Sequence, residues 1–430
     1  MHKSAYNFLS LLLLASLLPL GGCKQREASS VVFSVGGAPS ELAVWEELVD
    51  DFEAETGISV EIRRQPSDTD QQRQGLIIAL KAGITDPDVF MMDVAWLGLF
   101  AASGWLTPLD GVDRRPFFPH IIDRVDTFDG QLVALPVYMD GGVLYYRKDL
   151  LDHLGMASPP ATWQELLSSA LLLQRSLRSE NPDFYGFVWQ GAQYEGLITT
   201  FLEFAGSRGG FKRQDGKILL NTEPNRRALA FMRDLIWKYQ VSPPNTYTAM
   251  KEEEVRHYFQ EGDALYERNW PYAWSLHQQP GSPVRGLTGI TGVPAFSRET
   301  AVSTLGGWHV GISRYSDVPS LALEFVKYIT SRKAQKKMVL ALGWNPGRQD
   351  LYTDPEIVEQ VPYLTELKRV FKNARARPLV PYYSQMSAIA QRRINAALAG
   401  KYSPAAALEM AESDIAALLA RYRLEEETPY

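Results

Sequence analysis

Apolar segments of two different periods alternate in the first part of this chain, and this alternation limits the fold more than any other feature. Residues 31–35 form a short apolar run, and residues 58–62 alternate apolar with polar side chains, as strands do. Between them, apolar residues recur at helical spacing from Leu42 to Phe52, and Gly57 ends the pattern. Strand, helix and strand joined by short connections predict a right-handed βαβ unit and a parallel sheet.

The same two patterns continue along the chain. Further helices are expected at residues 72–82, 96–102, 162–176, 224–239, 320–331 and 403–422. Further strands are expected at residues 88–93, 130–136 (a turn that enters a strand), 143–146 and 264–266. The helix at 162–176 opens with a capping box formed by Thr162 and Glu165. The sequence therefore predicts a mixed α/β fold, in which ligands bind beyond the carboxyl ends of the parallel strands.

Composition narrows the classes of function. At 430 residues and 45% hydrophobic, the chain has enough apolar residues for a packed core, and its length predicts two domains. A net charge of −6 argues against a nucleic-acid partner. The six histidines are scattered and no metal, nucleotide or nucleophile motif occurs, so we expect no metal, no cofactor and no catalytic cysteine. With one cysteine, no intramolecular disulfide can form.

An apolar leader that ends at this cysteine occupies the start of the chain. A basic start, an apolar stretch too short to span a bilayer and a small-residue cleavage site predict a signal peptide over residues 1–22. Cys23 after Leu-Gly-Gly resembles a bacterial lipobox, which implies lipid on Cys23 and a lipidated tether over residues 23–30. The protein is then exported and held at the membrane, facing the periplasm or the cell exterior. A plain cleaved signal and a buried core segment are the alternatives.

Six segments in order along the chain together resemble the extracellular solute-binding proteins of carbohydrate ABC importers, a family similar to maltose-binding protein, and within it the trehalose/maltose-binding branch. The segments are residues 86–93 with Trp96 and 104–109; 135–142 with 144–151; 187–196; 268–273; 305–308; and 376–378 before Tyr382 and Tyr383. They span nearly the whole chain after the leader.

This resemblance implies a periplasmic-binding-protein-like (type II) fold, with two α/β lobes joined at a hinge and a ligand cleft between them. We expect residues 31–138 and 296–342 in the amino-terminal lobe, and residues 139–295 and 343–430 in the carboxyl-terminal lobe. The chain is expected to cross between the lobes near residues 136–140, 292–296 and 342–347, which all contain Pro or Gly.

The resemblance also implies the residues of the site. A sugar offers flat ring faces and hydroxyl groups, which aromatic side chains and carboxylate, amide or guanidinium groups bind. The expected ligand-binding residues are Glu41, Asp93, Tyr138, Asp140, Trp270, Tyr272, Gly307, Trp308 and Arg377, with Arg73 and Glu195 as weaker candidates.

The local sequence gives further reasons to expect some of these residues in a binding site. Trp270 and Tyr272 are two apart, so on an extended segment both point to one side. Gly307 precedes Trp308 and leaves room for a ligand to approach the backbone. Each residue also has a structural interpretation: for example, Glu41 suits the first turn of a helix.

The implied function is a substrate-binding lipoprotein of a sugar ABC importer, without enzymatic activity. It captures an α-linked disaccharide or related glycoside and delivers it to the transmembrane permease subunits, which work with a cytoplasmic ATPase. We expect a monomer. Two alternatives remain at this stage: a sensor subunit that presents its closed form to a receptor, and a lipid-anchored glycoside hydrolase using a carboxylate pair from Asp93, Asp140 and Glu195.

Overall fold

The computed structural model describes residues 30–66, 68–215 and 217–427. The expected signal peptide, Cys23 and the tether up to residue 29 lie outside the described residues. Within the described part, none of the helices combines the length and the apolar composition needed to cross a membrane.

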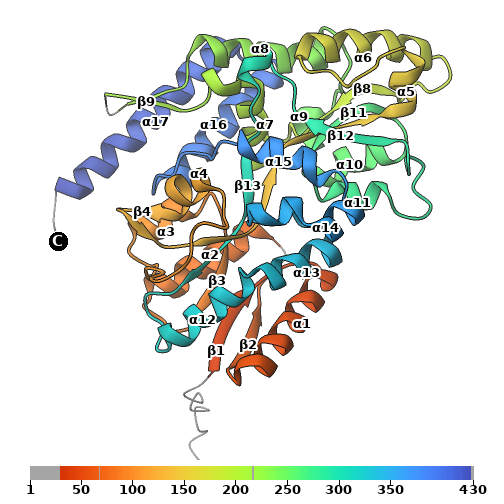
Figure 1. The fold of residues 1–430 in the computed structure, drawn as a ribbon. Coiled ribbons are helices and arrows are strands. Elements are labelled where there is room, and N and C mark those ends of the chain that lie inside the picture. Colours follow the sequence, from red (N-terminus) through yellow and green to blue (C-terminus); the bar gives the residue numbers. More distant parts are fainter. Residues whose placement is uncertain (1–29, 67, 216, 428–430) are drawn as a thin grey trace, which may run out of the picture.

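A five-stranded sheet forms the lower part of the molecule in Figure 1. Its strands in spatial order are β2 (Ser59–Arg64), β1 (Ser30–Val35), β3 (Val89–Asp93), β13 (Leu305–Ile312) and β6 (Leu135–Gly141). β1 pairs in parallel with β2 and with β3, which confirms the parallel sheet predicted from the first part of the sequence. The other half of the sheet is antiparallel, because β13 runs opposite to both β3 and β6.

Helices and short elements cover this sheet. They are α1 (Pro39–Thr56), α2 (Thr69–Lys81), α3 (Leu97–Ala102), α4 (Pro119–Ile121), η1 (Ile122–Asp126), β4 (Thr127–Phe128), β5 (Gln131–Leu132), α12 (Pro319–Ile329) and α13 (Arg332–Leu342). α1 explains the apolar pattern at helical spacing that the sequence shows between Leu42 and Phe52. It buries Trp45, Leu48 and Phe52 on one face, and it ends at Gly57, whose φ of 71° lies in the left-handed region that glycine adopts easily.

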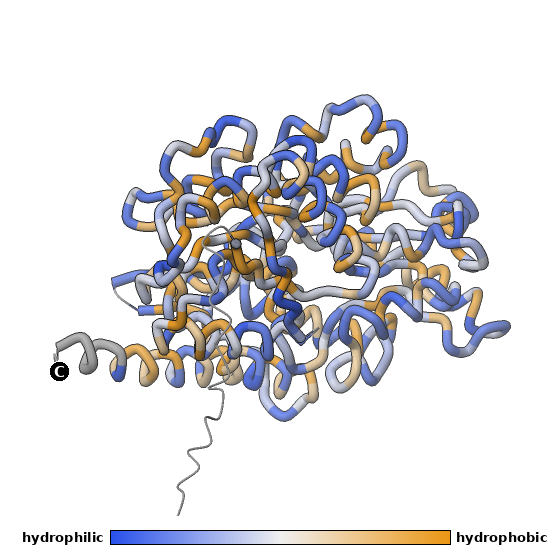
Figure 2. Tube along the Cα trace, turned by 90° about the horizontal axis from the view of Figure 1, so that it is seen from below, coloured by the Kyte–Doolittle hydropathy of each residue, from blue (hydrophilic) through white to orange (hydrophobic). Residues whose placement is uncertain are grey.

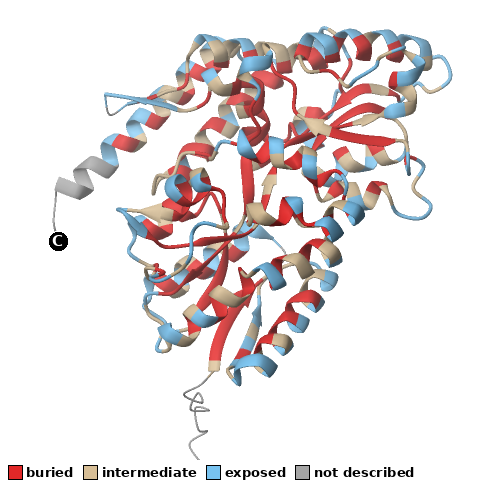
Figure 3. Ribbon diagram, in the orientation of Figure 1, coloured by how far each residue is buried: buried red, intermediate tan, exposed pale blue. Residues whose placement is uncertain are grey.

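A four-stranded sheet forms the upper part of the molecule. Its strands in spatial order are β12 (Thr288–Gly292), β7 (Val143–Arg147), β11 (Ala264–Asn269) and β8 (Tyr185–Val188). β7 pairs antiparallel with both of its neighbours, and β11 pairs in parallel with β8. All six residues of β11 are buried, so this strand lies at the centre of its lobe (Figure 3).

The remaining elements surround this second sheet or follow it along the chain. They are α5 (Lys148–His153), α6 (Trp163–Leu177), α7 (Glu195–Ala205), η2 (Gly206–Arg208), β9 (Lys212–Gln214), β10 (Lys217–Leu219), α8 (Glu223–Trp237), α9 (Thr246–Ala249), α10 (Glu252–Gln260), α11 (Ala273–His277), η3 (Arg298–Thr300), η4 (Gln349–Thr353), α14 (Pro355–Gln360), α15 (Leu364–Lys372), α16 (Tyr383–Leu398) and α17 (Pro404–Glu427). The predicted capping box of α6 is confirmed: the Glu165 N–H donates to Thr162 Oγ1 (3.2 Å) and the Thr162 N–H donates to Glu165 Oε2 (3.1 Å).

The chain passes three times between the two sheets. β6 leads almost directly into β7 through Gly142; residues 293–304 connect β12 to β13; and residues 343–354 follow α13. β13 runs through the middle of the molecule between the two lobes (Figure 1). This arrangement is the expected two-lobe α/β fold, and the exact lobe boundaries remain a prediction.

Aromatic packing holds each lobe together. In the first lobe, the rings of Phe33, Trp45 and Phe325 meet edge to face at 5.1 Å. In the second lobe, Trp163 and Phe204 stack with their ring centres 4.0 Å apart. In Figure 2, hydrophobic stretches of the chain are frequent towards the interior, while the outer turns are mostly hydrophilic. One buried cluster packs α1 and α12 on the first sheet, and the other joins α2, β3 and α3 to the core of the second lobe.

Candidate ligand-binding cleft

Two adjoining cavities lie where the lobes meet. The first, which we call the charged cavity, has a volume of about 300 Å³. It is lined by residues of both lobes: Thr69, Asp70, Arg73, Asp93, Ala95, Trp96, Gln193, Tyr194, Glu195, Arg377, Tyr383, Ser384, Ala388 and Gln391. Four of the residues predicted from the sequence, Arg73, Asp93, Glu195 and Arg377, therefore come together here.

Arg377 is the central cation of the charged cavity. Its Nη2 lies 3.0 Å from Asp93 Oδ1 of β3, and its Nη1 lies 3.0 Å from Glu195 Oε1 at the start of α7. Burial disfavours the charged guanidinium, but these two carboxylates outweigh burial and raise the pKa of Arg377 above its usual value. Its Nε is buried and has no partner among the described residues, so one donor remains for a ligand.

The carboxylates of the charged cavity are held in place by their own elements. Asp93 Oδ1 also accepts the Ala95 N–H (2.7 Å) in the turn between β3 and α3. Glu195 accepts hydrogen bonds from the hydroxyls of Tyr383 and Ser387 on α16. Arg73 crosses the cleft: its Nη1 donates to Ser384 Oγ of α16 at 2.7 Å. These contacts join α2 and β3 of one lobe to α7 and α16 of the other.

The second cavity, which we call the aromatic cavity, has a volume of about 180 Å³ and shares Thr69 with the first. It is lined by Val35, Gly36, Gly37, Glu41, Trp45, Thr69, Gln72, Met91, Tyr138, Trp308 and Trp344. Tyr138 stacks on Trp344 with the ring centres 4.1 Å apart. Trp308 lies between Asp93 and Tyr138 in the register of the sheet, and thus beside the charged cavity.

Glu41 serves two roles at the rim of the aromatic cavity. Its Oε2 accepts the Ala38 N–H at 2.7 Å, so Glu41 caps the start of α1. This agrees with the expectation that Glu41 suits the first turn of a helix. It also lines the cavity.

Asp140 lies near the hinge and lines neither of the two cavities. Burial raises its pKa to about 7, and the negative charges of Asp93 and Glu41 add to the rise. A hydrogen bond from Asn345 and the charge of Arg268 act in the opposite direction. Burial, and the negative charges of Asp140, Glu41 and Asp93, also raise the pKa of Tyr138 well above its usual value.

The two glycines before Trp308 make room for neighbouring protein atoms. Gly307 has a φ of 113°, and a Cβ there would lie 2.5 Å from Tyr138 O. A Cβ on Gly306 would lie 3.2 Å from the ring of Trp270. Strand β6 therefore gives a structural reason for glycine at position 307, and the approach of a ligand to its backbone stays a prediction.

Trp270 and Tyr272 do not lie on an extended segment as expected. Tyr272 has helical dihedral angles (φ −55°, ψ −31°) at the start of α11, because the chain turns after β11. Trp270 Nε1 donates to Glu252 Oε1 (3.3 Å), and the Tyr272 hydroxyl donates to Glu253 Oε1 (2.6 Å). Neither side chain lines the charged or the aromatic cavity.

The structure also brings in residues that the sequence analysis did not select. Trp344 follows Gly343 in the third connection, the same aromatic-after-glycine signal that marked Trp308. Gln72 lies on α2, and Tyr383 and Gln391 lie on α16. Polar and aromatic residues on helices are too common for these to be distinguished without the fold.

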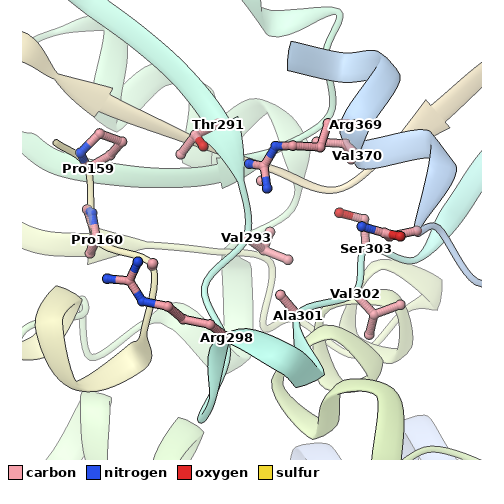
Figure 4. A pocket seen from close by; sticks show the side chains of 13 residues that line it. Pro159, Pro160, Thr291, Val293, Arg298, Ala301, Val302, Ser303, Arg369 and Val370 are labelled. Carbon is pink, nitrogen blue, oxygen red and sulfur yellow. The ribbon is translucent and has the colours of Figure 1, made fainter.

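A further cavity of about 210 Å³ lies beside the second connection (Figure 4). The side chains of Arg298 and Arg369 lie on different sides of it, and each is paired with a carboxylate, Glu165 and Glu366 respectively. It contains none of the residues expected to bind ligand.

Known proteins share this fold and much of this sequence. Residues 38–336 match the family described as bacterial extracellular solute-binding protein. A probable ABC transporter-binding protein of Deinococcus radiodurans is 35% identical over 379 residues, covering 86% of this chain and 89% of the relative.

Two solved structures show the extent of the likeness. The maltose-bound MalE3 protein of T. maritima is 36% identical, with a TM-score of 0.81 over 90% of this chain and 99% of that one. A solute-binding protein of Thermotoga lettingae bound to α-D-tagatose is 26% identical, with a TM-score of 0.77 over 91% and 100%. The chain therefore belongs to the family of bacterial extracellular solute-binding proteins.

Proposed function

We propose that this protein is the sugar-binding subunit of an ABC importer. It captures an α-linked disaccharide or a related glycoside, of the trehalose or maltose kind, between its lobes and delivers it to the permease. The observation that carries the proposal is the pairing of a charged cavity around Arg377 with an aromatic cavity around Trp308. Guanidinium and carboxylate groups bind sugar hydroxyls in pairs, and aromatic rings cover the apolar ring faces.

The relatives support the class of ligand. The T. maritima protein is bound to maltose and the T. lettingae protein to tagatose, and both align over at least 90% of this chain. The two cavities of the cleft measure about 300 and about 180 Å³. A disaccharide fits the lower end of the usual range for ligand pockets.

The proposed site consists of residues that the structure brings together in these cavities. Glu41, Asp93, Tyr138, Trp308 and Arg377 form its centre, and Arg73 and Glu195 close it from either lobe. Asp140 and Trp270, which border Gly306 of β13, and Tyr272 at the start of α11 surround this centre, and Gly307 precedes Trp308 within β13.

Export and lipid attachment form part of the same proposal. Residues 1–22 act as the signal peptide, and Cys23 carries the lipid that holds the protein at the membrane. Metabolic labelling with a radioactive fatty acid tests this: we expect label on the wild-type protein and none on Cys23→Ser. Label on both would place the lipid elsewhere, and label on neither would support a plain cleaved signal.

A thermal-shift panel tests the function itself. The protein that begins at Lys24 is melted with maltose, trehalose, sucrose, glucose and ribitol, and with amino acids as controls. A ligand that binds only the folded state raises the melting temperature with its concentration. We expect a shift with at least one α-linked disaccharide and none with amino acids. Release of glucose on prolonged incubation would instead support a glycoside hydrolase, and no shift with any sugar would contradict the proposal.

A further inference from the structure

A buried ion pair lies behind the cleft, outside both cavities. Arg268 of β11 and Glu203 of α7 have side chains 0% and 1% exposed. The guanidinium donates to both carboxylate oxygens, from Nε to Oε2 at 2.7 Å and from Nη2 to Oε1 at 2.6 Å. A third hydrogen bond runs from Nη1 to Gln190 Oε1 at 3.2 Å. The pair is thus fixed in one geometry.

The pair contacts the second connection between the lobes. The Thr304 N–H, one residue before β13, donates to Glu203 Oε1 at 3.2 Å. The Thr304 hydroxyl donates to Thr199 O on the same helix as Glu203, at 2.8 Å. The neighbouring Ser303 hydroxyl donates to Gly142 O at 2.7 Å, which ties the second connection to the first.

The pair also contacts the first connection. A Cβ on Gly142 would lie 1.9 Å from Glu203 Oε1 and 2.4 Å from Arg268 Nη2. No side chain fits there, so the second glycine of the Asp140-Gly141-Gly142 sequence is needed for space. The backbone between β6 and β7 therefore packs directly against the ion pair.

On its other side, the pair reaches an aromatic ring at the hinge. The guanidinium carbon of Arg268 lies 4.3 Å from the ring centre of Trp270. The edge of that ring borders Gly306 of β13, where a Cβ would lie 3.2 Å from it. Two connections and one ring thus share a single rigid support.

Stability alone is a weak reason for such a pair, because replacing a buried ion pair by apolar side chains of similar size is often neutral for folding. We propose that Glu203 and Arg268 are positioning residues for lobe closure: they hold both connections and the Trp270 ring as one unit, so that the lobes close over a ligand in one fixed geometry. This inference rests on the proposed function.

The test uses two ways of disturbing the pair. The double variant Glu203→Leu/Arg268→Met removes both charges and keeps apolar bulk in the core. The variant Gly142→Ala keeps both charges and pushes the pair from the backbone side. Glu412→Gln serves as the matched control, because its carboxylate also accepts backbone N–H groups, from Leu220 and Asn221, in the carboxyl-terminal lobe.

Three quantities are measured on each protein: the melting temperature, the dissociation constant for the sugar that gives the largest thermal shift, and the decrease in radius of gyration on adding that sugar. We expect the double variant to melt within about 5 °C of the wild type. We expect its dissociation constant to rise at least about tenfold and its ligand-induced compaction to be lost, because the closed state is less populated. Gly142→Ala changes in the same direction, and Glu412→Gln behaves as the wild type.

Two results would overturn the inference while leaving the proposed function intact. In the first, the double variant binds and compacts like the wild type. In the second, affinity falls only in proportion to melting temperature in both variants, which would make the pair merely structural. If the wild type itself binds no sugar, the proposed function fails and this inference fails with it.

Discussion

The charged cavity and the aromatic cavity share Thr69 but are assembled differently. The charged cavity takes α2 and β3 from one lobe and α7, Arg377 and α16 from the other. The aromatic cavity takes nearly all of its lining from the first lobe and the connection that contains Trp344. The aromatic surface therefore exists within one lobe, whereas the charged cavity is complete only when the lobes are together.

This difference separates two tasks of a binding protein. A preformed aromatic surface suits the first capture of a sugar ring, since it needs no domain motion. A charged cavity shared between lobes suits closure, because each hydrogen bond that it makes with ligand also joins the lobes. The predictions below disturb one cavity at a time.

The largest effect is expected for Arg377→Met in the charged cavity. The substitution removes the buried guanidinium, including its unpaired Nε, as a donor to the ligand, and losing a hydrogen bond to a charged group costs about 1.5–3 kcal/mol, roughly ten- to a hundredfold in Kd. Titration calorimetry measures it. Arg393→Met is the control, because its ion pair with Asp414 lies on α16 and α17 outside both cavities. Equal affinity in both variants would remove Arg377 from the site.

A smaller effect is expected for Trp308→Ala in the aromatic cavity. The variant loses an aromatic contact surface worth about 1–3 kcal/mol of binding free energy. Trp237→Ala provides the comparison, because this tryptophan is 46% exposed and lies on α8 away from the cleft. We expect calorimetry to show weaker binding for the first variant only. If both variants bind like the wild type, the aromatic cavity does not contact the sugar.

The smallest effect is a pH dependence through Asp140. Its pKa is raised to about 7 by burial, so the carboxyl group is largely protonated at pH 6 and largely ionised at pH 8. Asp140 lines neither cavity, so we expect ligand hydroxyls to reach it through water. Such hydrogen bonds favour the ionised form, so affinity should rise with pH across this range and level off above it. Asp140→Asn should flatten the profile measured by calorimetry. A wild-type profile that falls with pH, or one unchanged in the variant, would contradict this role.

The sequence predicted the local elements well because their signals are local. The βαβ start, the helix that ends at Gly57 and the capping box at Thr162 are all confirmed. Each depends on residues close together in the chain: a period, a left-handed glycine or a reciprocal pair of hydrogen bonds.

The sequence missed features that depend on distant partners. β13 joins the first sheet more than 200 residues after β3, and it makes that sheet half antiparallel. The turn after β11 redirects Tyr272, and the backbone of β6 explains Gly307. Arg377 and Asp93 are 284 residues apart. Only the resemblance to a family selected both for one site, and no local pattern predicted the ion pair between them.

The most direct test of the account is a crystal structure of the protein with the disaccharide that gives the largest thermal shift. The account predicts one sugar ring against Trp308 in the aromatic cavity, with hydroxyls of the ligand bonded to Asp93 and Arg377 in the charged cavity. A sugar bound outside these two cavities, or lobes that close without enclosing it, would contradict the account.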